Sequence, residues 1–201
     1  MDYSGFYFIT DSKLTKQGIL KDVADAIGAG AKIVQYREKD KDVCDMEREA
    51  SELKRLCEDK AKFIINDDIA LALACGADGV HLGQDDGNVL AAKNAFKGGI
   101  VGVTVHDLAE ACEAEENGAD YLGVSPIFLT STKLDAGEPA GLSLVKDIKS
   151  LTHLPIVAIG GITLENAGDV LSAGADGICA ISATVATDDV KEAVKAFSKL
   201  I

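Results

Sequence analysis

Gly76-Ala77-Asp78-Gly79-Val80 is a short sequence motif, here called a phrase, that decides the fold. It recurs as Gly174-Ala175-Asp176-Gly177-Ile178. Gly30-Ala31-Lys32-Ile33-Val34 and Gly118-Ala119-Asp120-Tyr121-Leu122 follow the same pattern. In each copy, a stretch with helical composition precedes the glycine and a short apolar run follows it. Glycine readily adopts the left-handed conformation that ends a helix. The phrase therefore predicts the end of a helix followed directly by a β-strand.

The spacing of the four phrases indicates how many strands the fold contains. Their first glycines lie 46, 42 and 56 residues apart, whereas one strand and helix with short loops need about 25 residues. Each interval therefore holds two such units. The remaining strands are predicted over 6–9, 62–65, 100–104 and 155–159, where short continuous apolar runs are typical of strands buried on both faces.

Helices are predicted between these strands, over residues 15–29, 42–59, 68–75, 87–96, 107–117, 143–151, 163–173 and 188–200. Asp107 and Thr163 occupy positions expected for N-caps, and Glu110 is the expected capping-box partner of Asp107. Asp68 is interpreted as the cap of the third helix.

Eight strand–helix units without a linker predict an α/β fold, a single (β/α)₈ TIM barrel that spans residues 1–201 as one domain. A doubly wound open sheet is the alternative. It usually has fewer strands and a glycine fingerprint after the first strand, and Thr10-Asp11-Ser12 is not that fingerprint.

Composition and charge restrict the class of protein. The 201 residues include 33 acidic and 20 basic side chains, a net charge of −13, which argues against a nucleic-acid or anionic membrane surface as partner. No stretch approaches the roughly 20 apolar residues of a membrane span, and the N-terminus does not resemble a signal peptide. Five scattered cysteines without a Cys-x-x-Cys pair are typical of a reduced protein. We expect a cytoplasmic protein that binds small molecules, and its oligomeric state stays open.

Ligands bind at the carboxyl ends of the strands in a TIM barrel, and this rule sorts the polar residues into two groups. Asp78, Asp120 and Asp176 begin strands and are interpreted as turn carboxylates that stabilise the opposite end. Polar residues that follow the apolar runs are expected to share one concave site: Gln35, Arg37, Lys39, Asn66, Asp67, Asp68, Gln84, Asp85, Asp86, Thr104, His106, Thr130, Ser131, Thr132, Lys133, Gly160, Gly161 and Ser182.

A phosphate site is indicated after the last two strands. Gly160-Gly161 leads towards a predicted helix, and a flexible backbone before a helix can offer amide groups to a phosphate. The loops after strands seven and eight are the common phosphate site of this fold, and Ile181-Ser182 lies in the second of them.

Paired carboxylates and basic side chains indicate a metal ion and a diphosphate. Asp67 and Asp86 follow neighbouring strands, and two carboxylates without a His or Cys cluster suit Mg²⁺. Arg37, Lys39 and Lys133 supply local positive charge that could bind phosphate oxygens.

The histidines give less information. His81 lies within a predicted strand and is interpreted as a hydrogen-bonded barrel residue. His106 follows the fifth strand and is either a general base or part of the helix entry. No Ser-His-Asp or Cys-His set can be placed, so the sequence does not support covalent catalysis.

Over essentially its whole length, the sequence resembles the thiamine phosphate synthase family. The phrases that carry the resemblance are Gln35-Tyr36-Arg37-Glu38-Lys39, Asn66-Asp67-Asp68, Gly79-Val80-His81-Leu82-Gly83-Gln84-Asp85-Asp86, Gly102-Val103-Thr104-Val105-His106, Pro126-Ile127-Phe128-Leu129-Thr130-Ser131-Thr132-Lys133 and Ile159-Gly160-Gly161-Ile162. Two departures are Thr104, where the family commonly has serine, and Ser125, where glycine is frequent.

The resemblance implies an enzyme that joins a hydroxymethylpyrimidine diphosphate to a thiazole phosphate, with Mg²⁺ and a largely dissociative step. It implies that Arg37, Lys133 and Thr104 are catalytic and that Asp67 and Asp86 bind Mg²⁺. The substrate-binding residues that it implies are Gln35, Tyr36, Arg37, Glu38, Lys39, Asn66, Thr104, Thr130, Ser131, Thr132, Lys133, Gly161, Ile181 and Ser182.

Two other functions remain as alternatives. A thiazole tautomerase of the same superfamily would use His106, but it has no diphosphate for Asp67 and Asp86 to serve. A non-catalytic sensor of a phosphorylated ligand is compatible with the fold alone. It has no evident use for two carboxylates of the kind that bind a metal.

Overall fold

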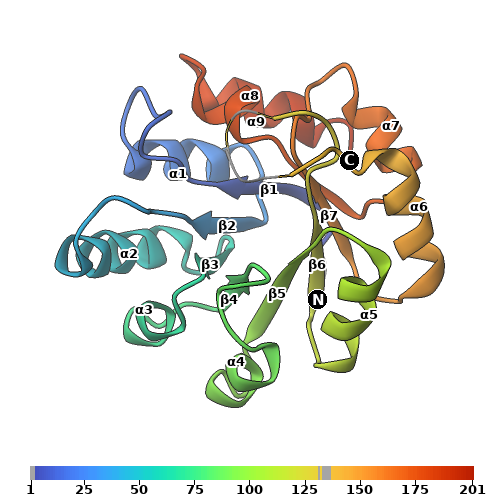
Figure 1. Cartoon of the computed structure of the whole chain (residues 1–201). Helices are drawn as coiled ribbons and strands as arrows, with labels where there is room; N and C mark the ends of the chain where they lie inside the picture. The colour runs from blue at the N-terminus through green and yellow to red at the C-terminus, as the bar shows by residue number, and fades with distance from the viewer. Residues whose placement is uncertain (1–2, 131, 133–136) are drawn as a thin grey trace.

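Eight parallel strands close into a barrel in the computed structural model, in the order in which they occur in the sequence (Figure 1). The structure describes residues 3–130, 132 and 137–201. The last strand pairs with the first and so closes the ring. The strands are β1 (Gly5–Ile9), β2 (Ile33–Tyr36), β3 (Lys62–Asn66), β4 (Gly79–Leu82), β5 (Ile100–Val105), β6 (Tyr121–Val124), β7 (Ile156–Ile159) and β8 (Gly177–Cys179). The predicted TIM barrel is confirmed.

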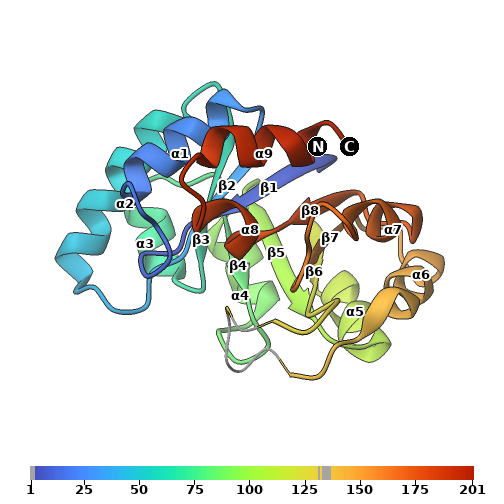
Figure 2. The same ribbon diagram turned by 90° about the horizontal axis from the view of Figure 1, so that it is seen from above.

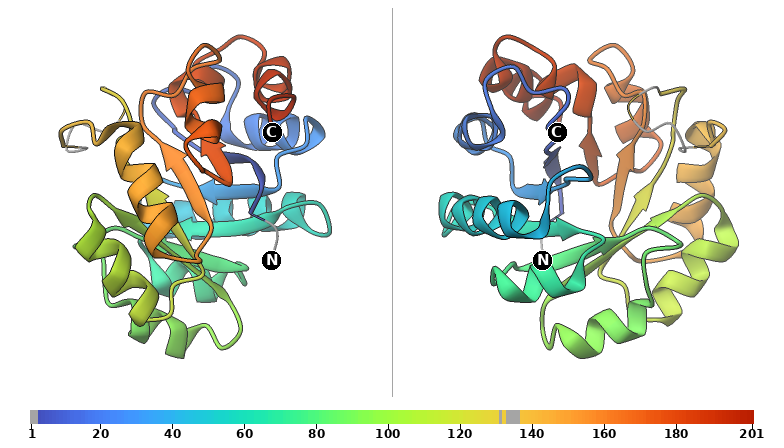
Figure 3. Two further views of the ribbon diagram at one scale, coloured as in Figure 1. Left: turned by 90° about the vertical axis from the view of Figure 1, so that its right-hand side faces the viewer. Right: turned by 60° about the vertical axis from the view of Figure 1, so that its left-hand side comes forward.

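Helices surround this barrel, as the turned views show (Figure 2 and Figure 3). They are α1 (Ile19–Gly28), α2 (Val43–Cys57), α3 (Ile69–Ala74), α4 (Val89–Ala95), α5 (Leu108–Glu116), α6 (Gly141–Leu151), α7 (Ala167–Ser172), α8 (Ile181–Val185) and α9 (Val190–Ser198). The last helix, α9, packs against α1 and β1. Within the described residues, no helix is long and apolar enough to cross a membrane.

Side-chain caps fix the start of several helices. Asp42, Asp68, Asn88, Asp107 and Asp189 each precede a helix and accept the backbone N–H three residues further on. Such a bond satisfies one of the N–H groups that have no partner within the helix. The predicted caps at Asp68 and Asp107 are confirmed.

Three helices differ from the prediction. α1 begins only after Gly18, whose φ of 92° is not helical, so residues 15–18 are irregular. α7 begins after Asn166, whose side chain accepts the Thr163 N–H, so the prediction of Thr163 as an N-cap is wrong. The short α8 was not predicted, because five residues are too few to show a helical period. It contains Ser182, which we expected in a loop.

Side chains of the strands alternate between two buried layers. On β1, Phe6 and Phe8 join the core between the sheet and the helices, whereas Tyr7 and Ile9 join a second cluster inside the barrel. Successive side chains of a strand point to opposite faces. This alternation decides which side chains can reach a ligand in the barrel mouth.

A repeated aspartate clamp holds the other end of the barrel together. Asp78 donates its N–H to the Phe63 carbonyl at 2.8 Å, and its Oδ2 accepts both the Phe63 N–H at 2.9 Å and Lys54 Nζ at 2.7 Å. The same contacts recur for Asp120 with Val101 and Lys93, and for Asp176 with Ile156 and Lys149. The first phrase of the sequence carries Lys32 at this position. The interpretation of these aspartates as structural is confirmed.

We expect Asp78→Ala to lower the free energy of unfolding by about 2 kcal/mol, because it leaves a strand N–H and a lysine without their acceptor. Burial alone would raise the pKa of Asp78, but Lys54 and the Phe63 N–H hold it below its ordinary value. A lowered pKa gives stability that is present at neutral pH and is lost as the pH falls through the folded-state value. Urea unfolding should therefore show a smaller difference between wild type and variant at about pH 3 than at pH 7.

Asp147→Ala, a change at an exposed position of α6, is the control and should alter stability by less than about 0.5 kcal/mol. Equal effects of Asp78→Ala and Asp147→Ala at pH 7 would contradict the clamp.

Candidate active site

A cavity of about 380 Å³ opens where the strands end, and it brings most of the predicted site residues together. Residues of all eight strands or of the loops after them line it. The predicted residues among them are Gln35, Arg37, Lys39, Asn66, Asp67, Gln84, Asp85, Asp86, Thr104, His106, Thr130, Thr132, Gly160 and Ile181. Ser131 and Lys133 lie outside the described residues.

The two predicted metal ligands lie side by side at the mouth of this cavity. Asp67 follows β3 with a left-handed φ of 64° and donates its N–H to the His81 carbonyl at 2.8 Å. Asp86 lines the same cavity and is near enough to act on the Asp67 carboxyl group. Burial, together with the Asp86 carboxylate, raises the pKa of Asp67 above its ordinary value, although Lys39 opposes this shift. Two acids held this close fit a divalent cation, which would relieve their repulsion.

Neighbouring groups hold the two carboxylates in place. Lys39 Nζ lies 2.5 Å from Asp67 Oδ2, and Asn66 Nδ2 donates to Asp67 Oδ1 at 2.6 Å. Asp86 Oδ2 accepts the Gly83 N–H at 3.0 Å. Asp68, the next residue after Asp67, is not part of the cavity lining, because it caps α3 through the Leu71 N–H. The structure therefore separates two adjacent aspartates into a ligand-facing and a capping residue.

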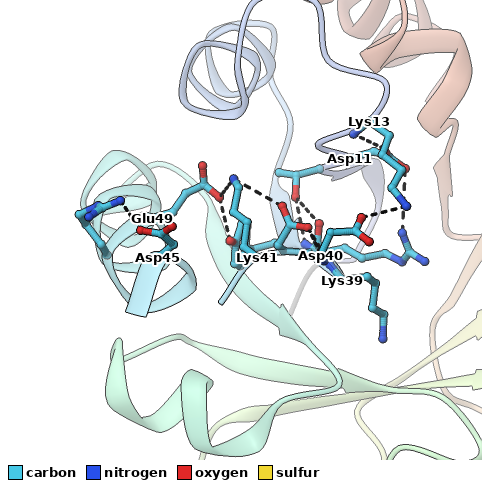
Figure 4. Close-up of polar contacts among 12 residues, drawn as sticks. Asp11, Lys13, Lys39, Asp40, Lys41, Asp45 and Glu49 are labelled. Carbon is cyan, nitrogen blue, oxygen red and sulfur yellow. Dashed lines mark hydrogen bonds and ion pairs between the residues drawn. The ribbon is translucent and has the colours of Figure 1, made fainter. Parts of the chain in front are cut away.

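The loop after β2 carries the basic side of the site (Figure 4). Two ion pairs flank this loop, Lys13 with Asp40 at 2.8 Å and Lys41 with Glu49 at 2.7 Å. The Lys39 side chain points away from both pairs (Figure 4) and reaches across to β3. The charged residues that follow Lys39 are thus paired with other side chains, whereas Lys39 faces the cavity.

Arg37 is held by the end of β1. Its backbone N–H donates to Thr10 Oγ1 at 2.9 Å, and Thr10 Oγ1 in turn donates to the Arg37 carbonyl at 3.3 Å. The guanidinium Nη1 lies 3.9 Å from Asp11 Oδ2. Because Asp11 is itself bonded to the N–H groups of Lys13 and Leu14, it gives Arg37 a fixed anionic neighbour.

The structure places Tyr36 and Glu38, two of the implied substrate contacts, outside the cavity lining. Tyr36 points outward between β2 and α2, where its hydroxyl donates to Glu49 Oε2 at 2.7 Å. Glu38 is buried and accepts the N–H groups of Lys39 and Asp40 at 2.8 and 2.9 Å. Strand alternation explains the outward direction of Tyr36. Both residues shape the loop that presents Arg37 and Lys39.

A glycine turn after β7 forms the other side of the mouth. Gly160 and Gly161 have φ values of 103° and 63°, which favour glycine. A Cβ at Gly161 would lie 2.6 Å from the Leu129 carbonyl oxygen and 2.8 Å from Phe128 Cβ, so a side chain does not fit. Gly161 and Ser182 are not in the lining itself, whereas Gly160 and Ile181 next to them are.

His106 lies in the cavity wall, and its ring is tied to the following helix. Glu110 Oε2 accepts the His106 N–H at 2.6 Å and lies 3.0 Å from His106 Nδ1. Glu110 was expected to reach the N–H of Asp107 in a capping box, and it reaches the preceding residue. The structure thus supports a helix-entry role for His106, whose side chain also borders the cavity.

The floor of the cavity contains functional candidates that sequence reasoning missed. Tyr7 and Tyr121 lie inside the barrel, and their hydroxyl groups are 2.7 Å apart. His81 bonds through both ring nitrogens, to Tyr121 and Thr104, which confirms it as a hydrogen-bonded barrel residue. Tyr7 lies two residues before Ile9 and therefore on the same inward face, so strand alternation could have found it.

TIM-barrel enzymes carry out their chemistry at this end of the barrel, and the cavity with its paired acids and basic side chains is therefore the candidate active site. The chain belongs to the thiamine monophosphate synthase family, whose model matches residues 6–184. It is thus an enzyme of the transferase class.

Individual relatives agree with this family. The chain is 50% identical to the thiamine-phosphate synthase of Methanosarcina barkeri over 98% of this chain and 90% of that protein. It is 47% identical to the thiamine-phosphate synthase of Methanosarcina mazei over 98% of this chain and 82% of that protein. The thiamine phosphate pyrophosphorylase structure from Pyrococcus furiosus superposes with a TM-score of 0.92 at 37% identity and covers 99% of this chain and 96% of its own.

Proposed function

We propose that this chain joins 4-amino-2-methyl-5-hydroxymethylpyrimidine diphosphate to 4-methyl-5-(2-hydroxyethyl)thiazole phosphate in a Mg²⁺-dependent reaction that yields thiamine phosphate and diphosphate. Family membership supports the overall reaction. The observation that carries the mechanism is that Asp67 and Asp86 line one cavity mouth, where Lys39 is bonded to Asp67.

The residues at the β2 to β4 side of the mouth would bind the diphosphate. Asp67 and Asp86 would hold Mg²⁺, which supplies positive charge to the leaving diphosphate when bound. Arg37 can bind phosphate oxygens through two parallel N–H groups, and Lys39 acts as a compact charge. These cations are fixed before the substrate arrives, so little reorganisation is needed when the leaving group takes up negative charge.

The reaction then depends on the correct placement of the two substrates and does not need a side chain that acts as a general base. The bond between the pyrimidine methylene carbon and the diphosphate oxygen breaks, and the oxygen keeps the electron pair. The thiazole nitrogen supplies the electron pair for the new carbon–nitrogen bond, so no proton must be removed. Thr104 and Gln35, deeper in the cavity, would hold the pyrimidine in line with this attack.

The phosphate of the second substrate would bind at the glycine side of the mouth. Thr130 and Thr132 offer hydroxyl groups there, and the turn at Gly160 and Gly161 offers backbone N–H groups. Ser182 lies in the first turn of α8, next to this region. The two anionic groups thus bind on opposite sides of the opening and leave the reacting atoms between them.

A coupled assay tests the proposal. Purified protein with both substrates and Mg²⁺ should form thiamine phosphate and diphosphate in equal amounts, which chromatography detects, and either substrate alone should give no product. Isomerisation of a thiazole substrate alone would favour a tautomerase. Binding of both substrates without turnover would favour a sensor.

Gly161→Ala is expected to raise the KM for the thiazole phosphate about tenfold or more, because the left-handed turn must shift to admit a Cβ. The KM for the pyrimidine diphosphate should change much less. Gly168→Ala is the matched control, since Gly168 lies in α7 with open space around it and should leave both constants unchanged. A parallel rise in both KM values would argue against a local phosphate site.

A further inference from the structure

A chain of hydrogen bonds crosses the barrel beneath the proposed pyrimidine site. Gln35 Nε2 donates to the Tyr7 hydroxyl at 2.9 Å, which lies 2.7 Å from the Tyr121 hydroxyl. The Tyr121 hydroxyl lies 2.8 Å from His81 Nδ1, and His81 Nε2 lies 2.8 Å from Thr104 Oγ1. The five side chains come from β2, β1, β6, β4 and β5, and all of them border the cavity. The chain connects Gln35 with Thr104, the two groups assigned to the pyrimidine.

The chain has a direction, because each hydroxyl group has one proton to donate. Burial raises the pKa values of Tyr7 and Tyr121, so both phenols keep their protons. Tyr7 accepts a bond from Gln35, and we assign its single proton to the Tyr121 hydroxyl 2.7 Å away. Tyr121 then donates to His81 Nδ1. A neutral imidazole that accepts at one nitrogen donates from the other. His81 Nε2 thus donates to Thr104, whose own proton is left for a ligand.

The hydrogen-bond direction at Gln35 therefore determines whether Thr104 offers a donor or an acceptor to a ligand. With Gln35 Nε2 bonded to Tyr7, Gln35 Oε1 is the atom able to accept a bond from a ligand, and the Thr104 hydroxyl is a donor. If the chain ran the opposite way, Gln35 would offer a donor and Thr104 an acceptor. A 4-aminopyrimidine has a donor amino group beside an acceptor ring nitrogen, whereas a 4-oxopyrimidine has an acceptor oxygen beside a ring N–H donor.

We propose that Tyr7, Tyr121 and His81 are positioning residues that couple the hydrogen-bond direction of Gln35 to that of Thr104 and so select a 4-aminopyrimidine over a 4-oxopyrimidine. This selection rests on the proposed function, because it concerns the pyrimidine substrate of that reaction. An isolated glutamine could rotate its amide group to suit either ring. The buried chain prevents this, since a rotated amide would have to reverse the bonds at every later member.

The backbone leaves space for the rings of this chain. A Cβ at Gly102 would overlap the Tyr121 ring, and a Cβ at Gly123 would lie 2.9 Å from His81 Cε1. The Tyr121 ring also packs against Tyr3, with 5.1 Å between ring centroids, and against His81, with 5.4 Å. Rings held on several sides have little freedom to reorient, which keeps the donors and acceptors in register.

Tyr121→Phe interrupts the chain at its centre and keeps the ring. Calorimetry in Mg²⁺ should compare the binding of the 4-amino and 4-oxo forms of the pyrimidine diphosphate to wild type and variant. We expect the ratio of the two affinities to fall about tenfold. The hydrogen bonds between Gln35 and Tyr7 can then reverse without any change in those between His81 and Thr104. The affinity for the thiazole phosphate should stay the same.

Two further variants complete the test. Tyr7→Phe interrupts the chain at another link and should reduce the ratio similarly, so it decides the matter if Tyr121→Phe does not fold. Tyr3→Phe removes a hydroxyl from the same aromatic cluster, at a residue outside the chain and the cavity lining, and should leave the ratio unchanged.

An unchanged ratio in a folded Tyr121→Phe or Tyr7→Phe protein would overturn the coupling, and so would an equal fall in Tyr3→Phe. The proposed function fails separately, if wild type binds both substrates but forms no product, since the binding ratios still report on the chain. A wild-type protein that binds neither pyrimidine overturns both proposals.

Discussion

Removal of divalent cations is expected to reduce the formation of thiamine phosphate about 1,000-fold or more, which corresponds to about 4 kcal/mol of transition-state stabilisation. The Asp86 carboxylate and burial both disfavour ionisation of Asp67, and a bound cation would offset that effect. Without it, the mouth would present two carboxylates to an incoming diphosphate. Among the described residues that line the mouth, Arg37 and Lys39 would then have to balance the charge of both.

The measurement is product formation after exhaustive chelation, followed by titration with Mg²⁺. Activity should return as the free Mg²⁺ concentration rises, and thermal melting without substrate should change little, because the aspartate clamps that stabilise the barrel lie at its other end. Full activity in the chelated protein would refute the assignment of the two aspartates to a metal.

Asp67→Asn is expected to lower kcat/KM for the pyrimidine diphosphate about 100-fold, and excess Mg²⁺ should restore part of the loss. Asparagine is the informative replacement, because it tolerates the left-handed φ of 64° at this position. Alanine would add backbone strain to the loss of charge. The remaining Asp86 carboxylate and the substrate oxygens can still hold a cation, so the variant should be weaker in metal binding and not inactive.

Asp68→Asn provides the matched control at the adjacent residue. Asparagine is a good N-cap, so the bond from the Leu71 N–H can persist and kcat/KM should stay within a few-fold of wild type. His106→Ala should also lose far less activity than Asp67→Asn. The reverse ranking of His106→Ala and Asp67→Asn would favour the tautomerase hypothesis.

The sequence predicted the barrel because its signals are local and repeated. Each helix end at a glycine phrase is followed by a strand, and the intervals between phrases leave room for two units. It also predicted that Asp67 and Asp86 would meet, because strand ends of neighbouring units must share one rim. These inferences require only the order of the strands and the position of each residue relative to its strand end.

Other features depend on side-chain direction or on partners distant in the sequence. Tyr36 lies within a phrase whose residues were expected to contact the substrate. The alternation of side chains along β2 instead directs Tyr36 towards α2. The contact between Tyr7 and Tyr121 joins residues 114 positions apart, and nothing local to either one indicates it. The five-residue α8 is fixed by its place after β8 and not by a periodic pattern.

Each of the three aspartate clamps fastens two consecutive strands and the helix that precedes them, far from the reacting groups. One rim of the barrel thus stabilises the fold, and the other rim carries the loops that line the candidate active site. Loops at the open rim can be exchanged, lengthened or charged differently while the opposite rim continues to fix the strand register. The barrel is therefore a scaffold on which new substrate preferences can be installed one loop at a time.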